Sequence, residues 1–289
     1  MVHEQLHIVL QWMQYMSAPK RRTAFDQVPE LYDRVRPGYP PELFDDLELL
    51  AGLTPDSRVL EIGAGTGQAT RSLADRGYRV VVLELGSGLA DVARRRLAAF
   101  PKIEVITAAF EDWPLSPEPF DLVFAATAWH WLEADVRLAK TAHALRPGSF
   151  LATVETHHVD GGTQRFFIDT QDCYQRWDPE TPPDCKLPTV DDVPFDDQEL
   201  LTNQDFTKPA FRDYETDIEY TADEYLDVLR TYSGTIAMTP DAATGLLNCI
   251  GTLINDHYDG RITKRYLRRL RISERAPYSD RLDPSFPDG

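Results

Sequence analysis

The segment that most restricts how this chain can fold is residues 59–67, Val-Leu-Glu-Ile-Gly-Ala-Gly-Thr-Gly. A short apolar run that ends in glycine is typical of a buried strand followed by a turn. Gly63, Gly65 and Gly67 let the backbone turn sharply and approach a ligand closely, because glycine has no Cβ. We expect a helix to begin near Gln68, so that its N-terminal amides point at the same place. The segment therefore predicts a strand, a ligand-binding turn and a helix.

The spacing of the glycines distinguishes between two classes of cofactor. A dinucleotide-binding fingerprint has the pattern G-x-G-x-x-G. In this chain the sixth position is Gln68, and the third glycine comes one residue early. The pattern G-x-G-x-G preceded by Glu61 resembles motif I of the class I S-adenosylmethionine (SAM) methyltransferases, whose turn wraps the amino-acid end of SAM.

Four later segments follow in the order usual for that family. The run 79–83 ends in Glu84, about 20 residues after the glycines, where a nucleotide-binding sheet places a carboxylate for the ribose hydroxyls. A third run at 103–107 leads into Ala-Ala-Phe-Glu-Asp-Trp-Pro, and a fourth at 120–126 begins with a Phe-Asp pair. Leu-Arg-Pro-Gly at 145–148 resembles the turn into the fifth strand. The resemblance spans residues 25–156 and continues weakly to about residue 275.

Strand and helix patterns alternate between residues 57 and 156, which predicts a parallel sheet with helices on both faces. The resemblance implies a Rossmann-like α/β fold with a seven-stranded sheet and a helical lid insertion. Its last strand, at 262–273, is expected to be antiparallel and to lie at the sheet edge. We also predict a strand at 211–220, helices at 41–52, 164–177 and 240–257, and a helix opened by a capping box from Thr221 to Glu224.

These elements suggest a division of the chain into six parts. They are an N-terminal extension (1–22), N-terminal cap helices (23–56), a SAM-binding core (57–156), a lid or substrate insertion (157–210), a segment completing the sheet (211–276) and a tail (277–289).

The resemblance implies a cofactor site built from several segments. The glycine turn would contact the methionyl part of SAM, while Glu61 would hold the turn or the SAM ammonium. Glu84 would take the ribose, with Leu85 against the adenine. Many relatives place an Asp two residues before the Glu-Asp pair, but this position is Ala109 here.

Phe110 would therefore offer its backbone amide to the adenine, and Glu111 would supply the missing acceptor. The N-terminal segment 32–40 resembles one that closes over SAM, with Arg36 and then Tyr32 as candidates for the SAM carboxylate. The expected cofactor residues are Tyr32, Arg36, Glu61, Gly63, Ala64, Gly65, Gly67, Glu84, Leu85, Phe110, Glu111 and Ala126.

The loop Ala-Thr-Ala-Trp-His-Trp-Leu at 126–132 follows the fourth strand, where methyl group and acceptor should meet. It resembles the His-Trp or Gln-Trp element of carboxyl methyltransferases, such as the trans-aconitate, juvenile hormone acid and fatty acid enzymes. His130 and Trp131 are therefore the candidate catalytic residues, with the tryptophan placing the acceptor. A carboxylate is already ionised at pH 7 and needs positioning, whereas a phenol or alcohol would need His130 as a base.

Aromatic side chains are expected to line the acceptor site, although each could instead pack in a core. An anionic acceptor also needs a local cation, for which Arg165 or Arg176 of the lid is a candidate. The expected substrate-binding residues are Trp129, Phe166, Phe167, Tyr174 and Trp177.

The composition of the chain indicates which binding partners and which cellular compartment we expect. The net charge of −17 argues against a nucleic-acid substrate, and no apolar stretch is long enough to span a bilayer. We interpret the basic stretch 264–275 as a strand that offsets an acidic surface. Three cysteines without metal-ligand spacing favour a reducing cytoplasm, and we expect no metal.

The sequence thus predicts SAM-dependent methylation of a small molecule, with a carboxylate oxygen on an apolar acid as the favoured acceptor. A phenol, alcohol, nitrogen or carbon acceptor with His130 as base is the alternative, as is a SAM-binding protein without catalysis. No oligomeric state is predicted.

Overall fold

A computed structural model describes residues 24–179, 181–182 and 186–277 of the chain. Its strands form one sheet in the order β3-β2-β1-β4-β5-β7-β6. The predicted N-terminal extension and nearly all of the predicted tail lie outside the described residues, and the division into six parts stays a prediction. The strands are β1 Arg58–Ile62, β2 Arg79–Glu84, β3 Ile103–Thr107, β4 Phe120–Ala126, β5 Leu145–His158, β6 Ala210–Thr221 and β7 Arg261–Glu274.

Helices cover both faces of the sheet, as predicted. Residues of α3 (Pro41–Ala51) and α4 (Gln68–Asp75) pack with Val59, Val80 and Leu270 on one face. Residues of α6 (Ala134–Ala144) and α9 (Gln198–Leu201) pack with Leu60 and Val123 on the other. The remaining helices are α2 Pro29–Val35, α5 Ser87–Leu97, α7 Gln164–Asp169, α8 Gln171–Trp177, α10 Ala222–Arg230, α11 Ser233–Ala237 and α12 Pro240–His257.

The seven-stranded sheet with an antiparallel last strand is confirmed, but the expected position of that strand at the edge is wrong. Strand β7 pairs antiparallel with both β5 and β6, so it lies inside the sheet and β6 is the edge. The physical reason is that every residue of β6 pairs with β7. The second edge of β7 is therefore covered by a hydrogen-bonded ladder.

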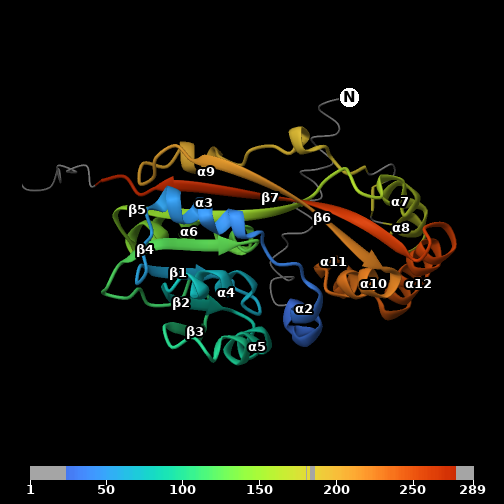
Figure 1. Ribbon diagram of the computed structural model, residues 1–289, viewed down its shortest axis with the longest axis horizontal. Coiled ribbons are helices and arrows are strands. Elements are labelled where there is room, and N and C mark those ends of the chain that lie inside the picture. Colours follow the sequence, from blue (N-terminus) through green and yellow to red (C-terminus); the bar gives the residue numbers. More distant parts are fainter. Residues whose placement is uncertain (1–23, 180, 183–185, 278–289) are drawn as a thin grey trace, which may run out of the picture.

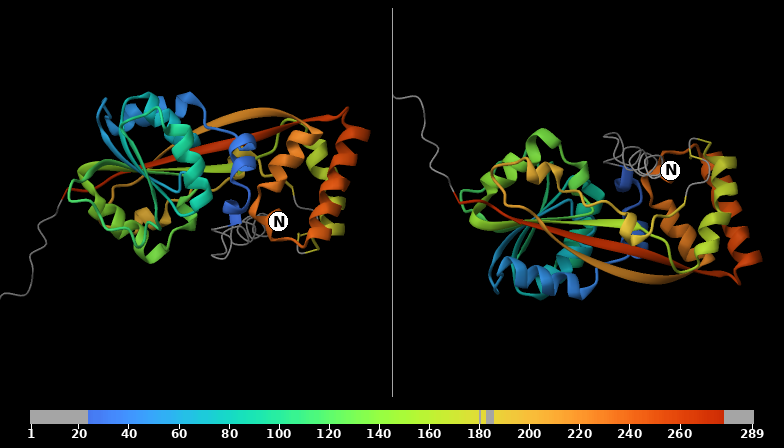
Figure 2. Two further views of the ribbon diagram at one scale, coloured as in Figure 1. Left: turned by 90° about the horizontal axis from the view of Figure 1, so that it is seen from below. Right: turned by 90° about the horizontal axis from the view of Figure 1, so that it is seen from above.

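Three long strands carry a second, smaller core away from the parallel part of the sheet. Strands β5, β6 and β7 run on to a group of helices, α7, α8, α10, α11 and α12, which we call the cap (Figure 1). Strand β7 contributes Leu270 to the sheet core but Ile262 and Tyr266 to the cap core. The cap is therefore a continuation of the sheet rather than a loosely attached insertion (Figure 2).

More of the chain builds the cap than the predicted lid insertion alone. Phe166 of α7 packs with Tyr225 of α10 and Leu246 of α12, both of which follow the predicted insertion in the chain. The predicted capping box begins α10: Thr221 Oγ1 accepts from the Glu224 amide at 3.3 Å. The two halves of the cap are joined by a disulfide between Cys173 of α8 and Cys249 of α12. This pairing counts against the reducing environment expected from the cysteine pattern.

We expect one free thiol per chain when the protein is unfolded without reductant. The chain has three cysteines, and the Cys173–Cys249 disulfide leaves only Cys185 to react. Titration with a thiol reagent should give one equivalent before reduction and three after it. Cys185→Ser is the matched control and should give none before reduction. Three equivalents in unreduced protein would contradict the pairing. Reduction of the Cys173–Cys249 disulfide should lower the free energy of unfolding by about 2–4 kcal/mol.

Candidate functional site

The glycine turn after β1 requires glycine at all three positions. Gly63, Gly65 and Gly67 have φ angles of 69°, 60° and 88°, in the region that side chains disfavour. At Gly63 a Cβ would lie 2.5 Å from the Cβ of Ala128, so any side chain would push away the loop after β4. Helix α4 begins at Gln68, as predicted, and its first amides face the turn. The turn thus places backbone without side chains at the carboxyl ends of β1 and β4, where a ligand can approach it closely.

Glu61 is a buried carboxylate without a hydrogen-bonding partner. It lies on β1, only 1% exposed, and neither carboxylate oxygen has a partner within the described residues. Burial raises the pKa of Glu61 to about 7, against a smaller opposing effect of the Thr70 hydroxyl and with a further increase from Glu84. An unpaired buried carboxylate is costly, so this position is suited to a cationic or hydrogen-bond-donating ligand.

Glu84 fixes the glycine turn against the next strand. At the end of β2 its Oε2 accepts from the Gly65 amide at 2.8 Å, and its Oε1 accepts from the Gly86 amide at 2.8 Å. Burial raises the pKa of Glu84, while these two amides lower it. Each carboxylate oxygen has a second lone pair, so Glu84 can hold the turn and still accept from a ligand hydroxyl.

Helix α2 covers the turn and ties it to the cap. It lies between the sheet and the cap in both views (Figures 1 and 2), and Tyr32 lies against Gly65. Arg36 donates from Nε to Thr231 Oγ1 at 2.8 Å and from Nη2 to the Thr231 carbonyl at 2.7 Å. Its guanidinium also lies 4.6 Å from the ring centroid of Tyr232. In this structure Arg36 therefore joins α2 to the cap; its predicted contact with a cofactor carboxylate stays a prediction.

The loop after β4 divides its two tryptophans between different environments. Trp129 is buried, and its Nε1 donates to Glu199 Oε1 at 2.6 Å. Trp131 packs edge-on against Phe25, with ring centroids 5.9 Å apart, and His130 is exposed. The structure therefore builds Trp129 into the core, whereas Trp131 is half-buried and His130 is exposed.

The remaining predicted cofactor residues line the neighbouring strand ends. Phe110 is buried below Lys140, whose Nζ lies 5.4 Å from its ring centroid. Glu111 Oε1 accepts from the Glu133 amide at 3.1 Å. Ala64 is buried in the turn, while Leu85 and Ala126 are half-buried directly after β2 and at the end of β4.

The predicted substrate-binding aromatics of the lid lie in the cap core. Phe166 is fully buried against Tyr225 and Tyr258, and a Cβ on Gly245 would lie 2.4 Å from the Trp177 ring. Phe167, Tyr174 and Trp177 are partly buried in the same cluster. Arg165 pairs with Asp169 in its own helix, and Arg176 stacks on the neighbouring Trp177.

The interpretation of β7 as a basic surface strand is wrong. Lys264, Arg268, Arg269 and Arg271 are all buried. A strand places alternate residues on opposite faces, so Lys264 and Arg268 share the face of Tyr266 and Leu270. The faces of β7 are covered by distant segments: Val193, Pro194 and Asp196 accept from Arg269 and Arg271 on one face, and Gly38 accepts from Arg268 on the other. No local pattern in the sequence indicates this burial.

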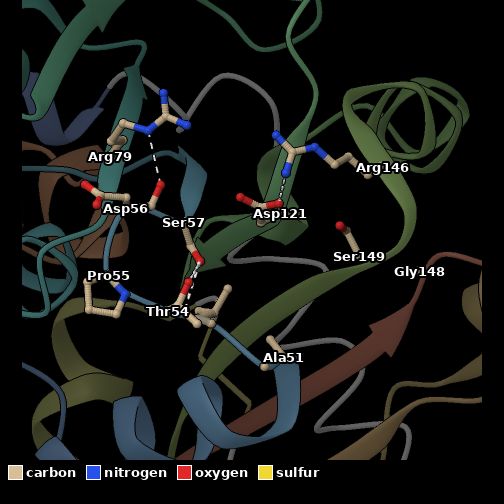
Figure 3. A pocket seen from close by; sticks show the side chains of 12 residues that line it. Ala51, Thr54, Pro55, Asp56, Ser57, Arg79, Asp121, Arg146, Gly148 and Ser149 are labelled. Carbon is tan, nitrogen blue, oxygen red and sulfur yellow. Dashed lines mark hydrogen bonds and ion pairs between the residues drawn. The ribbon is translucent and has the colours of Figure 1, made fainter.

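An open pocket of about 380 Å³ lies away from this site (Figure 3). Asp56, Arg79, Asp121, Arg146 and Ser149 are among its lining residues, and they belong to the opposite, amino-terminal edge of the parallel strands. Arg146 pairs with Asp121, and Arg79 donates to the Asp56 carbonyl at 3.1 Å. Its other charged side chains are also ion-paired, Asp56 with Lys102 and Arg79 with Glu118.

Comparison with known proteins shows what the central part of the chain is similar to. Residues 59–148 match the family model described as a methyltransferase domain. The chain is 39% identical over 123 residues to an uncharacterized methyltransferase of Mycobacterium tuberculosis, a match covering 43% of this chain and 48% of that one. An uncharacterized methyltransferase of Geobacillus kaustophilus is 30% identical over 145 residues, covering 47% of this chain and 66% of the relative. The chain thus spans about half the length of the mycobacterial relative that it matches.

Solved structures share the fold over most of the chain. A provisional type II methyltransferase of Anaeromyxobacter dehalogenans has a TM-score of 0.60 at 24% identity, covering 84% of this chain and 99% of that one. A phosphoethanolamine N-methyltransferase of Haemonchus contortus, in complex with S-adenosylhomocysteine, has a TM-score of 0.50 at 16% identity, covering 87% and 57%. These likenesses establish the Rossmann-like methyltransferase fold. Within the described residues no helix is long and apolar enough to cross a membrane, and no cluster of metal-binding side chains is present.

We expect Glu61→Gln to stabilise the ligand-free protein at neutral pH. The folded-state pKa of Glu61 lies above its ordinary value, so ionisation opposes folding as the pH rises from about 4.5 to 7. At pH 7.5 the variant should gain up to about 3 kcal/mol of unfolding free energy. At pH 4 the gain should vanish, because the carboxyl is then protonated in both states. Urea unfolding at the two pH values measures this, and an equal effect at both would contradict an ionised, unpaired Glu61.

Proposed function

We propose that this chain is a SAM-dependent methyltransferase that methylates a small molecule, and that the favoured acceptor is a carboxylate oxygen of an apolar acid. The methyltransferase domain at 59–148 supports the reaction class. The observation that carries the cofactor assignment is Glu61, a buried carboxylate beside the glycine turn for which the described residues provide no hydrogen-bonding partner. SAM carries an ammonium group, which is the kind of partner that this carboxylate lacks.

The residues present fit SAM at each of its ends. Glu61 would hold the ammonium, and the glycine turn would take the methionyl chain, since no side chain intrudes there. Glu84 would accept from the ribose hydroxyls, while Leu85, Phe110 and Glu111 would face the adenine. When bound, SAM would supply a methyl group activated on its sulfonium: the acceptor oxygen would bond to the methyl carbon in line as the carbon–sulfur bond breaks and S-adenosylhomocysteine leaves.

The protein's own task is then to position the acceptor and exclude water. A carboxylate has no proton to lose at pH 7, so the reaction requires alignment rather than a base. Trp131, His130 and the start of the cap stand beside the carboxyl end of β4, where the acceptor should approach. Because charge is neutralised as the ester forms, an enclosed apolar site favours the reaction over the same step in water.

Other acceptors remain alternatives within this proposal. A phenol, alcohol, nitrogen or carbon acceptor would require His130, or another group, to take up a proton. A SAM-binding protein without catalysis would retain Glu61 and Glu84 but produce no S-adenosylhomocysteine. The expectations of a cytoplasmic location and of a non-nucleic-acid substrate also stay predictions.

We expect Glu61 and Glu84 to act on different parts of the cofactor. Calorimetry with SAM and with 5′-methylthioadenosine, which lacks the amino-acid part, separates them. Glu61→Gln should weaken SAM but leave methylthioadenosine unchanged, because only SAM has the ammonium. Glu84→Ala should weaken both by about 1.5–3 kcal/mol, the value of hydrogen bonds to a charged group. Glu118→Gln, at the opposite end of the strands, is the control; unchanged SAM affinity in both variants would refute the assigned site.

We expect the rate with a carboxylate acceptor to stay flat from about pH 6 to 8, because a carboxyl group of pKa near 4 does not titrate there. S-adenosylhomocysteine formation would be followed for wild type, His130→Ala and Trp131→Ala. His130→Ala should reduce turnover modestly, while Trp131→Ala should mainly raise the KM for the acceptor. Desolvation lowers the pKa of His130 to about 4, so a histidine base would not titrate between pH 6 and 8 either. Loss of turnover in His130→Ala is therefore the result that would indicate a hydroxyl acceptor with histidine as base.

A further inference from the structure

Two buried cations of β7 lack the acidic partners that its other basic residues have. Arg261, Arg265, Arg269 and Arg271 each pair with a carboxylate, for example Arg269 with Asp213 at 2.8 Å. For Lys264 and Arg268 the structure shows no carboxylate partner among the described residues. In a chain of net charge −17, acids are abundant, so their absence around these two cations is selective.

Arg268 leaves most of its hydrogen-bonding capacity unused. It is 1% exposed, and its Nη2 donates to the Gly38 carbonyl at 3.1 Å. Its Nε and Nη1 have no acceptor within the described residues. Burying a guanidinium with unmatched donors is costly, and a bidentate anion is the ligand that its planar fork matches.

Lys264 lies on the same face, and both cations lie over the ring of Tyr266, with Lys264 Nζ 5.5 Å and Arg268 Cζ 4.7 Å from its centroid. Its Nζ lies 3.4 Å from the Tyr232 hydroxyl and 5.4–5.7 Å from the ring centroids of Phe167, Tyr225, Tyr232 and Tyr266. Burial lowers the pKa of Lys264. His158 packs against Tyr232 and Tyr266, and its pKa is lowered well below its ordinary value by burial and by Lys264, Arg36 and Arg268. The surroundings of the two cations are therefore aromatic and electropositive.

A short chain of contacts links Arg268 to the glycine turn. Arg268 lies opposite Thr156 of β5 in the ladder, and Thr156 Oγ1 is 3.0 Å from Thr127 Oγ1. Thr127 directly follows β4, has a φ of 56° and hydrogen-bonds Tyr39 at 3.0 Å. The next residue, Ala128, is the one that touches Gly63. Arg268 thus stands on the cap side of the place where methyl donor and acceptor would meet.

We propose that Arg268 and Lys264 form the acceptor's anion site, in which they bind the carboxylate of an acid whose apolar body lies among the aromatic residues of the cap. This inference rests on the proposed function and names the residues that would select its substrate. It replaces Arg165 and Arg176, the cations expected from the sequence, because Arg165 is paired within its own helix and Arg176 stacks on its neighbour. Methylation would convert the bound anion into a neutral ester, which these cations no longer hold, so product release follows from the same chemistry.

The test compares carboxylic acids with their neutral amides on protein saturated with S-adenosylhomocysteine. The probes are benzoate, phenylacetate, octanoate and decanoate, each with its primary amide, in titration calorimetry. Wild type should bind at least one acid ten-fold or more tightly than its amide. Arg268→Gln and Lys264→Gln should lose that preference, Arg268→Lys should retain part of it, and Arg261→Gln, an exposed and ion-paired position on the same strand, should keep it.

Binding of S-adenosylhomocysteine to each variant shows that the variant is folded and separates the two proposals. Wild type that binds no S-adenosylhomocysteine refutes the proposed function itself. Wild type that binds it but prefers none of the acids to its amide overturns the anion site, as does a preference that survives in Arg268→Gln. If Arg268→Gln weakens S-adenosylhomocysteine rather than the acids, Arg268 belongs to the cofactor carboxylate and the inference is wrong.

Discussion

The continuous antiparallel pairing of β5, β7 and β6 is the constraint on which the site depends. The parallel strands are short, and β1 has 5 residues, whereas β7 has 14 and extends well beyond them. At about 3.3 Å per residue, the additional residues let β5 run from the parallel sheet to the cap and let β7, which is antiparallel to it, run back. The cap core is attached to the sheet through residues such as Tyr266, so its position over the carboxyl ends of the parallel strands is set by a hydrogen-bonded ladder.

The basic residues of β7 have different partners on the two faces of the strand. The face of β7 that carries Arg265, Arg269 and Arg271 meets acids of β6 and of the segment 190–199, and these pairs neutralise it. On the opposite face, Arg268 and Lys264 meet tyrosines, threonines and a neutral histidine. Across the turn, the buried carboxyl group of Glu61 has no hydrogen-bonding partner in the part of the chain that the structure describes. The two kinds of unmatched charge suit a donor with an ammonium and an acceptor with a carboxylate, held on either side of the loop after β4.

Helix α2 couples these two sides. Tyr32 covers the glycine turn, and one turn later Arg36 holds Thr231 at the end of α10. Movement of α2 would therefore expose the turn and release the cap together. Such a connection gives a physical route by which cofactor binding and closure of the acceptor side can depend on each other.

The sequence by itself determined the parallel half of the fold and the cofactor turn. Glycines at 63, 65 and 67, the acid at 84 and the alternating apolar runs are local signals, because backbone turning and strand periodicity depend on neighbouring residues. The position of β7 inside the sheet, the disulfide between Cys173 and Cys249 and the burial of Arg268 were decided only by tertiary structure. Each depends on a partner far away in the chain. A basic residue such as Arg268 is expected at the surface until the distant segment that covers it, here the one containing Gly38, is known. Trp129 shows the same limit, since only its contact with Glu199, 70 residues away, makes it part of the core.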